Sequence, residues 1–238
     1  MFNLTVMRRD KAEQLLGTRE DMHAFLDYLL SLYGSGQSHA QFRQDIFAWL
    51  ASGMKRNGFF VEFGATDGIE LSNTYLLEQE FGWTGILAEP GRSWHADLTS
   101  NRASAISFDC VWSRTGETLE FNLLEEAALS TLTEFNTADG RRRDRKKGET
   151  YPVKTISLVD LLAQHDAPQT IDYLSIDTEG SEFDILSAFD FSKYQFNVIT
   201  CEHNFTPARA DIHTLLSQNG YTRVFPHISH CDDWYIRA

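Results

Sequence analysis

Three carboxylates gather around one glycine in the stretch IDYLSIDTEGSEFDIL, residues 171–186. Asp177 and Glu179 directly follow an apolar run that has the length of a buried strand. Acids at such a position have two explanations: an exposed charged loop, or a site that holds a cation or a hydroxylated ligand. Glu182 falls in the first turn of the next expected helix, where a negative charge favours the helix dipole and needs no ligand. Asp177 and Glu179 are therefore the candidates for chemistry.

A second polar group, CEHN at 201–204, ends another apolar run of the same kind. The ends of neighbouring parallel strands meet at one edge of a sheet, so this group is expected close to the first two acids. His203 is a candidate general base, because the ordinary pKa of histidine, near 6.5, lets it accept a proton at neutral pH. Hard oxygen ligands would also suit magnesium or calcium, and the predicted metal set is Asp177, Glu202 and Asn204, with Glu179 beside them. A structural histidine stays open as the plainer alternative.

The segment VEFGATDG (61–68) ends an expected strand and leads into an expected helix. Gly64 and Gly68 would let the backbone turn sharply and approach a ligand closely. Ser72 or Asn73 could cap the helix that follows. An ordinary strand-to-helix turn explains the same glycines, so this signal alone is weak.

The spacing of these glycines is not the G-x-G-x-x-G of dinucleotide-binding turns. A pyrophosphate binds to the backbone amides of such a turn, whereas Glu62 and Asp67 place negative charge beside this one. The turn therefore disfavours a phosphate-rich cofactor and favours one that carries an ammonium and a sulfonium.

Two further strand ends carry acids. Glu89-Pro90 ends the second apolar run, where a carboxylate can accept hydrogen bonds from both hydroxyls of a ribose. Asp109-Cys110 ends the third, where an acid or the following backbone could contact an adenine amine. Each acid alone is more often solvated, but all of them in chain order indicate a nucleoside site.

Short apolar runs alternate with amphipathic segments through most of the chain. The expected strands are 58–64, 84–90, 104–110, 171–177 and 196–204, and the expected helices between and after them are 72–81, 91–99, 157–164, 181–188 and 206–218. Ser157, Ser181 and Thr206 are the expected N-caps of the last three helices. Segments 221–225 and 232–238 are expected to form a final hairpin. This order predicts an α/β fold with a doubly wound, mostly parallel sheet.

The first 55 residues have a different texture. Residues 20–33 repeat apolar side chains at helical spacing, and AQFRQDIFAWLASGM repeats the pattern after the break at GSGQS. We expect a single domain over 1–238, with a helical extension at 1–55 and the sheet-containing core at 56–238.

Charge and cysteine usage exclude several classes of protein. A net charge of -13, from 21 Lys and Arg against 34 Asp and Glu, works against binding to nucleic acid or an anionic membrane. Three well-separated cysteines give neither a disulfide framework nor a cysteine zinc site. Charges at 8–11 interrupt any signal peptide, and no apolar run of about 18 residues occurs. We expect a soluble, cytoplasmic protein with a small-molecule or sugar partner.

The basic run GRRRDRKKGE at 140–149 has two explanations. It is either a solvated loop or a lid, 141–147, that recognises an acidic or phosphorylated acceptor. Three aromatic residues could stack on a sugar or pack in the core: Trp112, Tyr151 and Trp234. Asp232 and Asp233 form a turn before an edge strand or border an acceptor pocket.

The segments GFFVEFGATDGIELSNTYLLEQEFGWTGILAEP and DYLSIDTEGSEFDIL together resemble the FkbM family of S-adenosylmethionine-dependent methyltransferases. The similarity runs from about Gln41 to the C-terminus, and SNTYLLE and IDTEGSE are its most specific parts. The resemblance implies the class I, Rossmann-like fold. It also implies O-methylation of sugars and natural products, often beside a glycosyltransferase.

The resemblance assigns roles to individual positions. The implied cofactor-binding residues are Glu62, Gly64, Ala65, Thr66, Asp67, Gly68, Ser72, Asn73, Glu89, Pro90, Asp109, Cys110, Val111 and Asp177. Asn73 would lie near the amino-acid end of the cofactor and Glu89 on its ribose. The predicted catalytic residues are Asp177, Glu179 and His203. Two alternatives stay open: a nicotinamide-dependent oxidoreductase on a similar sheet, and a catalytically silent binding module.

Overall fold

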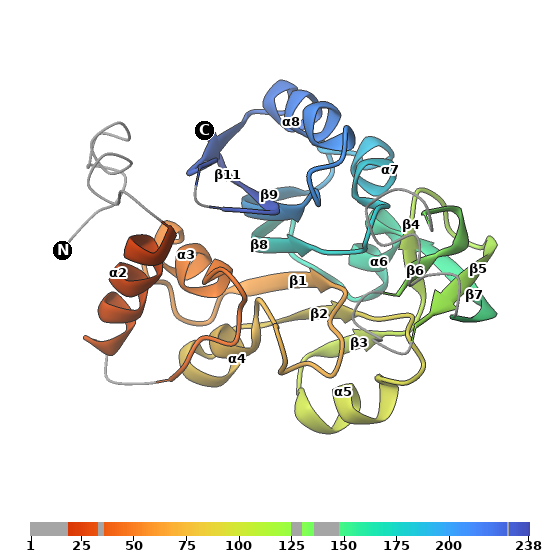
Figure 1. Ribbon diagram of the computed structural model, residues 1–238, viewed down its shortest axis with the longest axis horizontal. Coiled ribbons are helices and arrows are strands. Elements are labelled where there is room, and N and C mark those ends of the chain that lie inside the picture. The colour runs from red at the N-terminus through yellow and green to blue at the C-terminus, as the bar shows by residue number, and fades with distance from the viewer. Residues whose placement is uncertain (1–18, 33–35, 125–129, 136–147, 228) are drawn as a thin grey trace.

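A computed structural model of the chain describes residues 19–32, 36–124, 130–135, 148–227 and 229–238. The main sheet consists of β1 (Phe59–Phe63), β2 (Thr84–Ala88), β3 (Ala105–Ser107), β8 (Thr170–Ile176), β9 (Gln195–Glu202), β10 (Tyr221–Val224) and β11 (Asp232–Arg237). Their order across the sheet is β10-β11-β9-β8-β1-β2-β3 (Figure 1). Strands β1, β2, β3, β8 and β9 run parallel, and β11 lies antiparallel to both β9 and β10. The predicted doubly wound, mostly parallel α/β fold with a final hairpin is confirmed.

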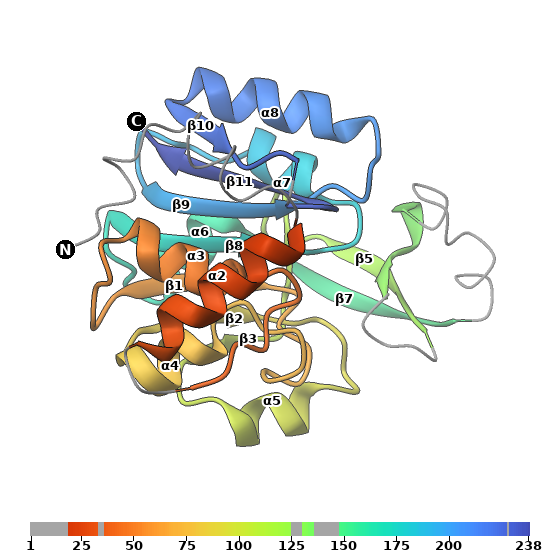
Figure 2. The ribbon, with the colours of Figure 1, turned by 60° about the vertical axis from the view of Figure 1, so that its left-hand side comes forward.

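Helices cover both faces of this sheet (Figures 1 and 2). One face carries α2 (Arg19–Ser31), α3 (Gln44–Ala51), α4 (Tyr75–Phe81) and α5 (His95–Asn101), and the other carries α6 (Leu158–Gln164), α7 (Glu182–Ser187) and α8 (Ala208–Gln218). Successive residues of a strand point to opposite faces of the sheet. Phe60 therefore packs in the first core, between the sheet and α2 to α5, and Val61 packs in the second core, between the sheet and α6 to α8. The two cores hold the strand ends in fixed positions.

Helix starts follow the expectations in part. The Ser157 hydroxyl accepts the backbone N–H of the residue three positions later at 3.2 Å, which confirms it as the N-cap of α6. Ser181 precedes α7 but makes no such bond. Thr206 was wrongly expected to cap α8: Pro207 holds that position. The Thr206 hydroxyl instead donates to the carbonyl of His203 at 2.9 Å.

A second sheet, which the sequence analysis missed, lies beyond the carboxyl ends of the main strands (Figure 2). It consists of β4 (Cys110–Trp112), β5 (Thr118–Leu123), β6 (Thr131–Leu132) and β7 (Glu149–Ser157), in the order β4-β7-β5-β6. The expected strand 104–110 is therefore wrong at its end, because β3 stops at Ser107 and Cys110 begins a strand of the other sheet. A small core of Cys110, Phe121, Leu132 and Val153 holds this sheet together.

The two N-terminal helices share the first core with the main sheet. Met22, Leu26 and Leu30 of α2 are buried in the same cluster as Phe60 of β1. The division into one domain stays a prediction, since residues 1–18 lie outside the described residues, as does the basic run 141–147. Within the described chain, no helix is both long and apolar enough to cross a membrane.

Candidate active site

A cavity of about 450 Å³ opens at the carboxyl ends of the parallel strands. Its walls come from the ends of β1, β2, β8 and β9 and from the loops that follow them. Phe121 and Leu132 of the second sheet and His230 in the loop before β11 complete it. This is the edge at which open α/β sheets bind their ligands.

Glu89, directly after β2, presents a fixed carboxylate to the cavity. It is 5% exposed, and its two oxygens accept backbone N–H bonds from Gly91 at 2.6 Å and from Thr66 at 3.0 Å. Burial raises the pKa of Glu89 to about 7. Each oxygen has a further lone pair, so the group can accept hydrogen bonds from two ligand hydroxyls.

Glu62, inside β1, fixes the loop that leads into α4. The backbone N–H of Asn73 donates to it at 2.6 Å, and the hydroxyls of Ser72 and Thr74 donate to the same carboxylate. The Asn73 amide nitrogen donates to the Ser175 hydroxyl at 2.9 Å, so the amide oxygen of Asn73 does not face Ser175. This oxygen, Oδ1, is buried with no partner among the described residues, and Asn73 lines the cavity. A cationic N–H donor of a ligand would satisfy it.

Gly64 makes the turn after β1 possible. Its φ is +74°, and a Cβ there would lie 2.0 Å from the carbonyl oxygen of Asp177. No other residue permits that approach, because its side chain would overlap the backbone at the end of β8. Glycine thus brings the ends of β1 and β8 together beside the cavity.

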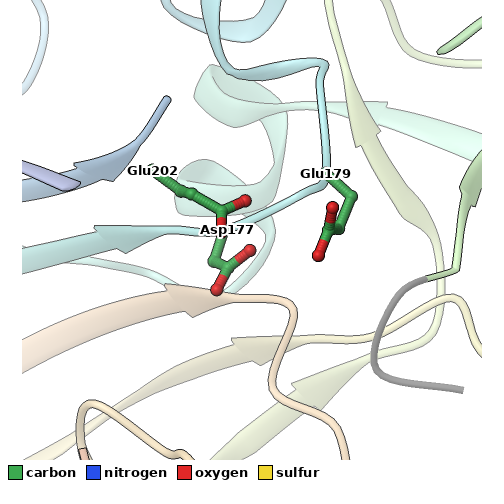
Figure 3. A group of neighbouring side chains, drawn as sticks. All are labelled: Asp177, Glu179 and Glu202. Atoms are coloured by element: carbon green, nitrogen blue, oxygen red, sulfur yellow. The ribbon is translucent and has the colours of Figure 1, made fainter. Parts of the chain in front are cut away.

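Asp177, Glu179 and Glu202 point toward one another inside the cavity (Figure 3). One oxygen from each carboxylate lies within 4.8 Å of the others. Asp177 and Glu202 hydrogen-bond to each other. Burial raises the pKa of Asp177 to about 7, and burial together with the charge of Asp177 raises the pKa of Glu202 further. Each group therefore keeps its proton to a higher pH than an ordinary carboxyl group does.

His203 does not present a free nitrogen to this cavity, which argues against the predicted role as general base. Its Nδ1 accepts the backbone N–H of Phe205 at 3.0 Å. The neutral ring then carries its proton on Nε2, which is buried and lies 3.8 Å from Asp233. Burial lowers the pKa of His203 to about 4. The ring fixes the turn after β9 instead.

The predicted cofactor residues divide into two groups. Thr66, Pro90, Cys110 and Val111 line the cavity together with the residues discussed above. Five are not among the described lining residues: Ala65, Asp67, Gly68, Ser72 and Asp109. Asp67 accepts the backbone N–H groups of residues 69 and 70, both at 2.8 Å, so it closes its own turn and does not face a ligand.

The predicted stacking and pocket residues are engaged elsewhere. Trp234 is 1% exposed and stacks on Phe47, so it is a core residue. The Tyr151 hydroxyl donates to the carbonyl of Pro90 at 3.2 Å and thereby ties the second sheet to the loop after β2. Asp233 pairs with Arg209 and with Arg223. Asp232, Asp233 and Trp112 are likewise absent from the described lining, and β11 is not an edge strand.

Left-handed backbone conformations concentrate around the cavity. Of 11 described non-glycine residues with positive φ, six line it: Thr66, Leu71, Glu179, Asn204, Phe205 and His230. Such conformations cost on the order of 1–3 kcal/mol each and persist where a site requires them. Among these, Leu71, Phe205 and His230 were missed by the sequence analysis, because loop residues of these types carry no pattern.

The family model for the methyltransferase FkbM domain matches residues 62–223. The chain belongs to the FkbM methyltransferase family. Among solved structures, a ribosomal protein L11 methylase from Lactobacillus delbrueckii subsp. bulgaricus is 12% identical with a TM-score of 0.39, over 83% of this chain and 80% of that one. A precorrin-6y C5,15-methyltransferase from Geobacter metallireducens GS-15 is 9% identical with a TM-score of 0.40, over 81% and 86%. No curated protein matches significantly.

Membership makes the protein an S-adenosylmethionine-dependent methyltransferase, and the cavity fits that cofactor. The unpartnered oxygen of Asn73 suits the cofactor's ammonium, and Glu89 suits its ribose hydroxyls. None of the described lining residues of the cavity is lysine or arginine. Six of them carry a carboxyl group: Glu62, Glu70, Glu89, Asp177, Glu179 and Glu202. The raised pKa values of Glu89, Asp177 and Glu202 reduce the negative charge of this lining, but no described lining lysine or arginine opposes a sulfonium cation.

Proposed function

We propose that this methyltransferase acts on a hydroxyl group, most simply one of a sugar or glycan. The observation that carries the proposal is that Asp177 and Glu202 lie together in the cavity, with oxygens within 4.8 Å of each other and of Glu179. A hydroxyl is a poor nucleophile until its proton is removed, and a base whose pKa lies near the working pH removes it most effectively. The sugar as acceptor class comes from the family resemblance.

The residues divide the work between binding and proton transfer. S-adenosylmethionine supplies an electrophilic methyl group on a sulfonium. Asn73 and Glu89 would hold its two ends, so that the carboxylates lie beside the acceptor. Asp177 would then accept the hydroxyl proton while Glu202 holds the Asp177 carboxyl group by a hydrogen bond. Glu179 would orient the acceptor. Transfer of a labelled methyl group to a panel of neutral and anionic sugars tests the proposal, and cofactor binding without transfer to any of them favours the silent module.

We expect Glu89→Gln to weaken S-adenosylhomocysteine binding by roughly 10- to 100-fold, because hydrogen bonds to a charged group are worth about 1.5–3 kcal/mol. Isothermal titration measures the change. Glu120→Gln, an exposed residue of β5, provides the matched control and should leave binding unchanged. Equal affinities for the two variants would show that Glu89 does not hold the ribose.

The same acids are the basis of the predicted divalent cation site. Asp177, Glu179 and Glu202 offer hard oxygen ligands, whereas the amide nitrogen of Asn204 donates to Glu179 at 3.3 Å. In that orientation the amide nitrogen of Asn204 faces Glu179, so only its oxygen Oδ1 could bind a metal ion. If a magnesium or calcium ion is required, a chelator should abolish methyl transfer and added metal restore it. Unchanged activity in the chelator would refute the cation and leave the carboxylate pair as the base.

A further inference from the structure

Two large apolar side chains are exposed at the cavity although most apolar side chains of this size are buried. Leu71 is 49% exposed and Phe205 is 63% exposed, and both line the cavity. Leu71 lies in the loop before α4, and Phe205 lies in the turn after β9. Apolar side chains that stay exposed at a ligand cavity are available for ligand contact.

The backbone holds these side chains in place at a cost. Leu71 and Phe205 both have φ of 57°, and His230 has φ of 58°. Neither leucine nor phenylalanine favours the left-handed region, so the surrounding structure must impose it. The three residues come from three separate loops, which makes a shared local cause such as one tight turn impossible.

Two histidine rings pack against Phe205. Its ring lies nearly perpendicular to that of His230, with centroids 5.4 Å apart and an interplanar angle of 87°. The His203 ring lies 5.3 Å away at 77°, and the backbone N–H of Phe205 donates to its Nδ1. His230 in turn packs 5.2 Å from Phe42, which is buried. A ring held in this way offers a preorganised face.

The charge of the cavity restricts what this face can bind. An anionic ligand would meet the carboxylates of Asp177, Glu179 and Glu202 with no lysine or arginine among the described lining residues to balance it. A neutral ring avoids that repulsion. The C–H face of a pyranose is apolar while its rim carries hydroxyls, so it combines the two properties that this cavity requires.

We propose that Leu71, Phe205 and His230 form an acceptor platform that binds the apolar face of a neutral pyranoside and discriminates against uronic acids and sugar phosphates. The proposal rests on the proposed function, because the platform would present the ring hydroxyl to Asp177. His203 acts here as a positioning residue through its bond to Phe205. A basic lid at 141–147 that recognises anionic acceptors is the competing interpretation, and it lies outside the described residues.

A matched pair of probes tests the platform: phenyl β-D-glucopyranoside and phenyl β-D-glucuronide. They differ only at C6, which is a hydroxymethyl group in the first and a carboxylate in the second. Their dissociation constants are measured by ligand-observed NMR on the full chain saturated with S-adenosylhomocysteine. We expect the neutral probe to bind at least several-fold more tightly. Phe205→Ala should weaken it by about three- to tenfold, because aromatic contacts contribute roughly 0.5–1.5 kcal/mol. Tyr28→Ala removes an aromatic ring that is 59% exposed on α2, away from the cavity, and should change nothing.

Each other outcome overturns the platform. These outcomes are equal or tighter binding of the glucuronide, binding of neither probe, and unchanged affinity in Phe205→Ala. Retained S-adenosylhomocysteine affinity shows that this variant is folded, as expected for a side chain this exposed. Failure of the proposed function looks different: platform-dependent binding would persist, but no labelled methyl group would reach any hydroxyl compound.

Discussion

Asp177→Asn is expected to lower kcat for methyl transfer by about 10²- to 10⁴-fold, the usual contribution of a general base. Asparagine has the same shape but cannot accept the proton. The close contact with Gly64 uses the backbone carbonyl of residue 177, so it survives the substitution. S-adenosylhomocysteine affinity should therefore change by no more than about threefold, which titration checks alongside single-turnover kinetics.

Matched variants separate this effect from general damage. Asp184→Asn makes the same change on α7, at a carboxylate outside the described cavity lining, and should retain activity. His203→Asn should cost much less than Asp177→Asn, because its Nδ1 accepts the backbone N–H of Phe205 and the residue is not among the described cavity lining. The opposite ranking would identify His203 as the base and refute the carboxylate pair.

The pH profile gives an independent check of the same base. Because burial raises the pKa of Asp177 to about 7, the pair loses its capacity to accept a proton as the pH falls through that value. We expect kcat/KM to rise between about pH 6 and pH 8. A base with the pKa of His203, about 4, would already be deprotonated at pH 6 and give a flat profile.

Position along the chain was enough to find the acids of the site, because the carboxyl ends of buried parallel strands lie at the edge of the sheet where ligands bind. Asp177, Glu89 and Glu202 lie at or just after the ends of β8, β2 and β9 as expected. The direction of a side chain is a different matter. The Nδ1 of His203 accepts the backbone N–H of Phe205 in a turn where Phe205 adopts positive φ, which phenylalanine rarely does and its residue type does not signal.

The second sheet was missed for another physical reason. Only two residues separate Ser107, the end of β3, from Cys110, the start of β4, so the continuous apolar run conceals the change of sheet. The alternation of Leu119, Phe121 and Leu123 with polar residues was a strand signal that could have been used. Without it, the walls that this sheet contributes to the cavity could not be anticipated.

Arg102 is the residue whose importance is least visible in the sequence, and it yields the largest expected effect on stability. Its side chain is fully buried between the loop after β1, residues 64–74, and α4. The guanidinium donates to the Gly68 carbonyl at 3.0 Å, to the Thr74 hydroxyl at 2.9 Å and to Glu78 at 3.0 Å. It also lies 3.7 Å from Glu62. These partners are distant in sequence, so no local pattern predicts the network.

We expect Arg102→Met to lower the free energy of unfolding by about 3–5 kcal/mol, because it leaves Glu62 and Glu78 without their cation. Urea denaturation measures the loss. Arg56→Met, an exposed arginine that donates to one carbonyl, should stay within about 0.5 kcal/mol. If the uncompensated charge is the cause, adding Glu62→Gln to Arg102→Met should recover part of the stability. A loss of similar size in Arg102→Lys would show that the planar fork, which alone reaches all of these acceptors, matters more than the charge.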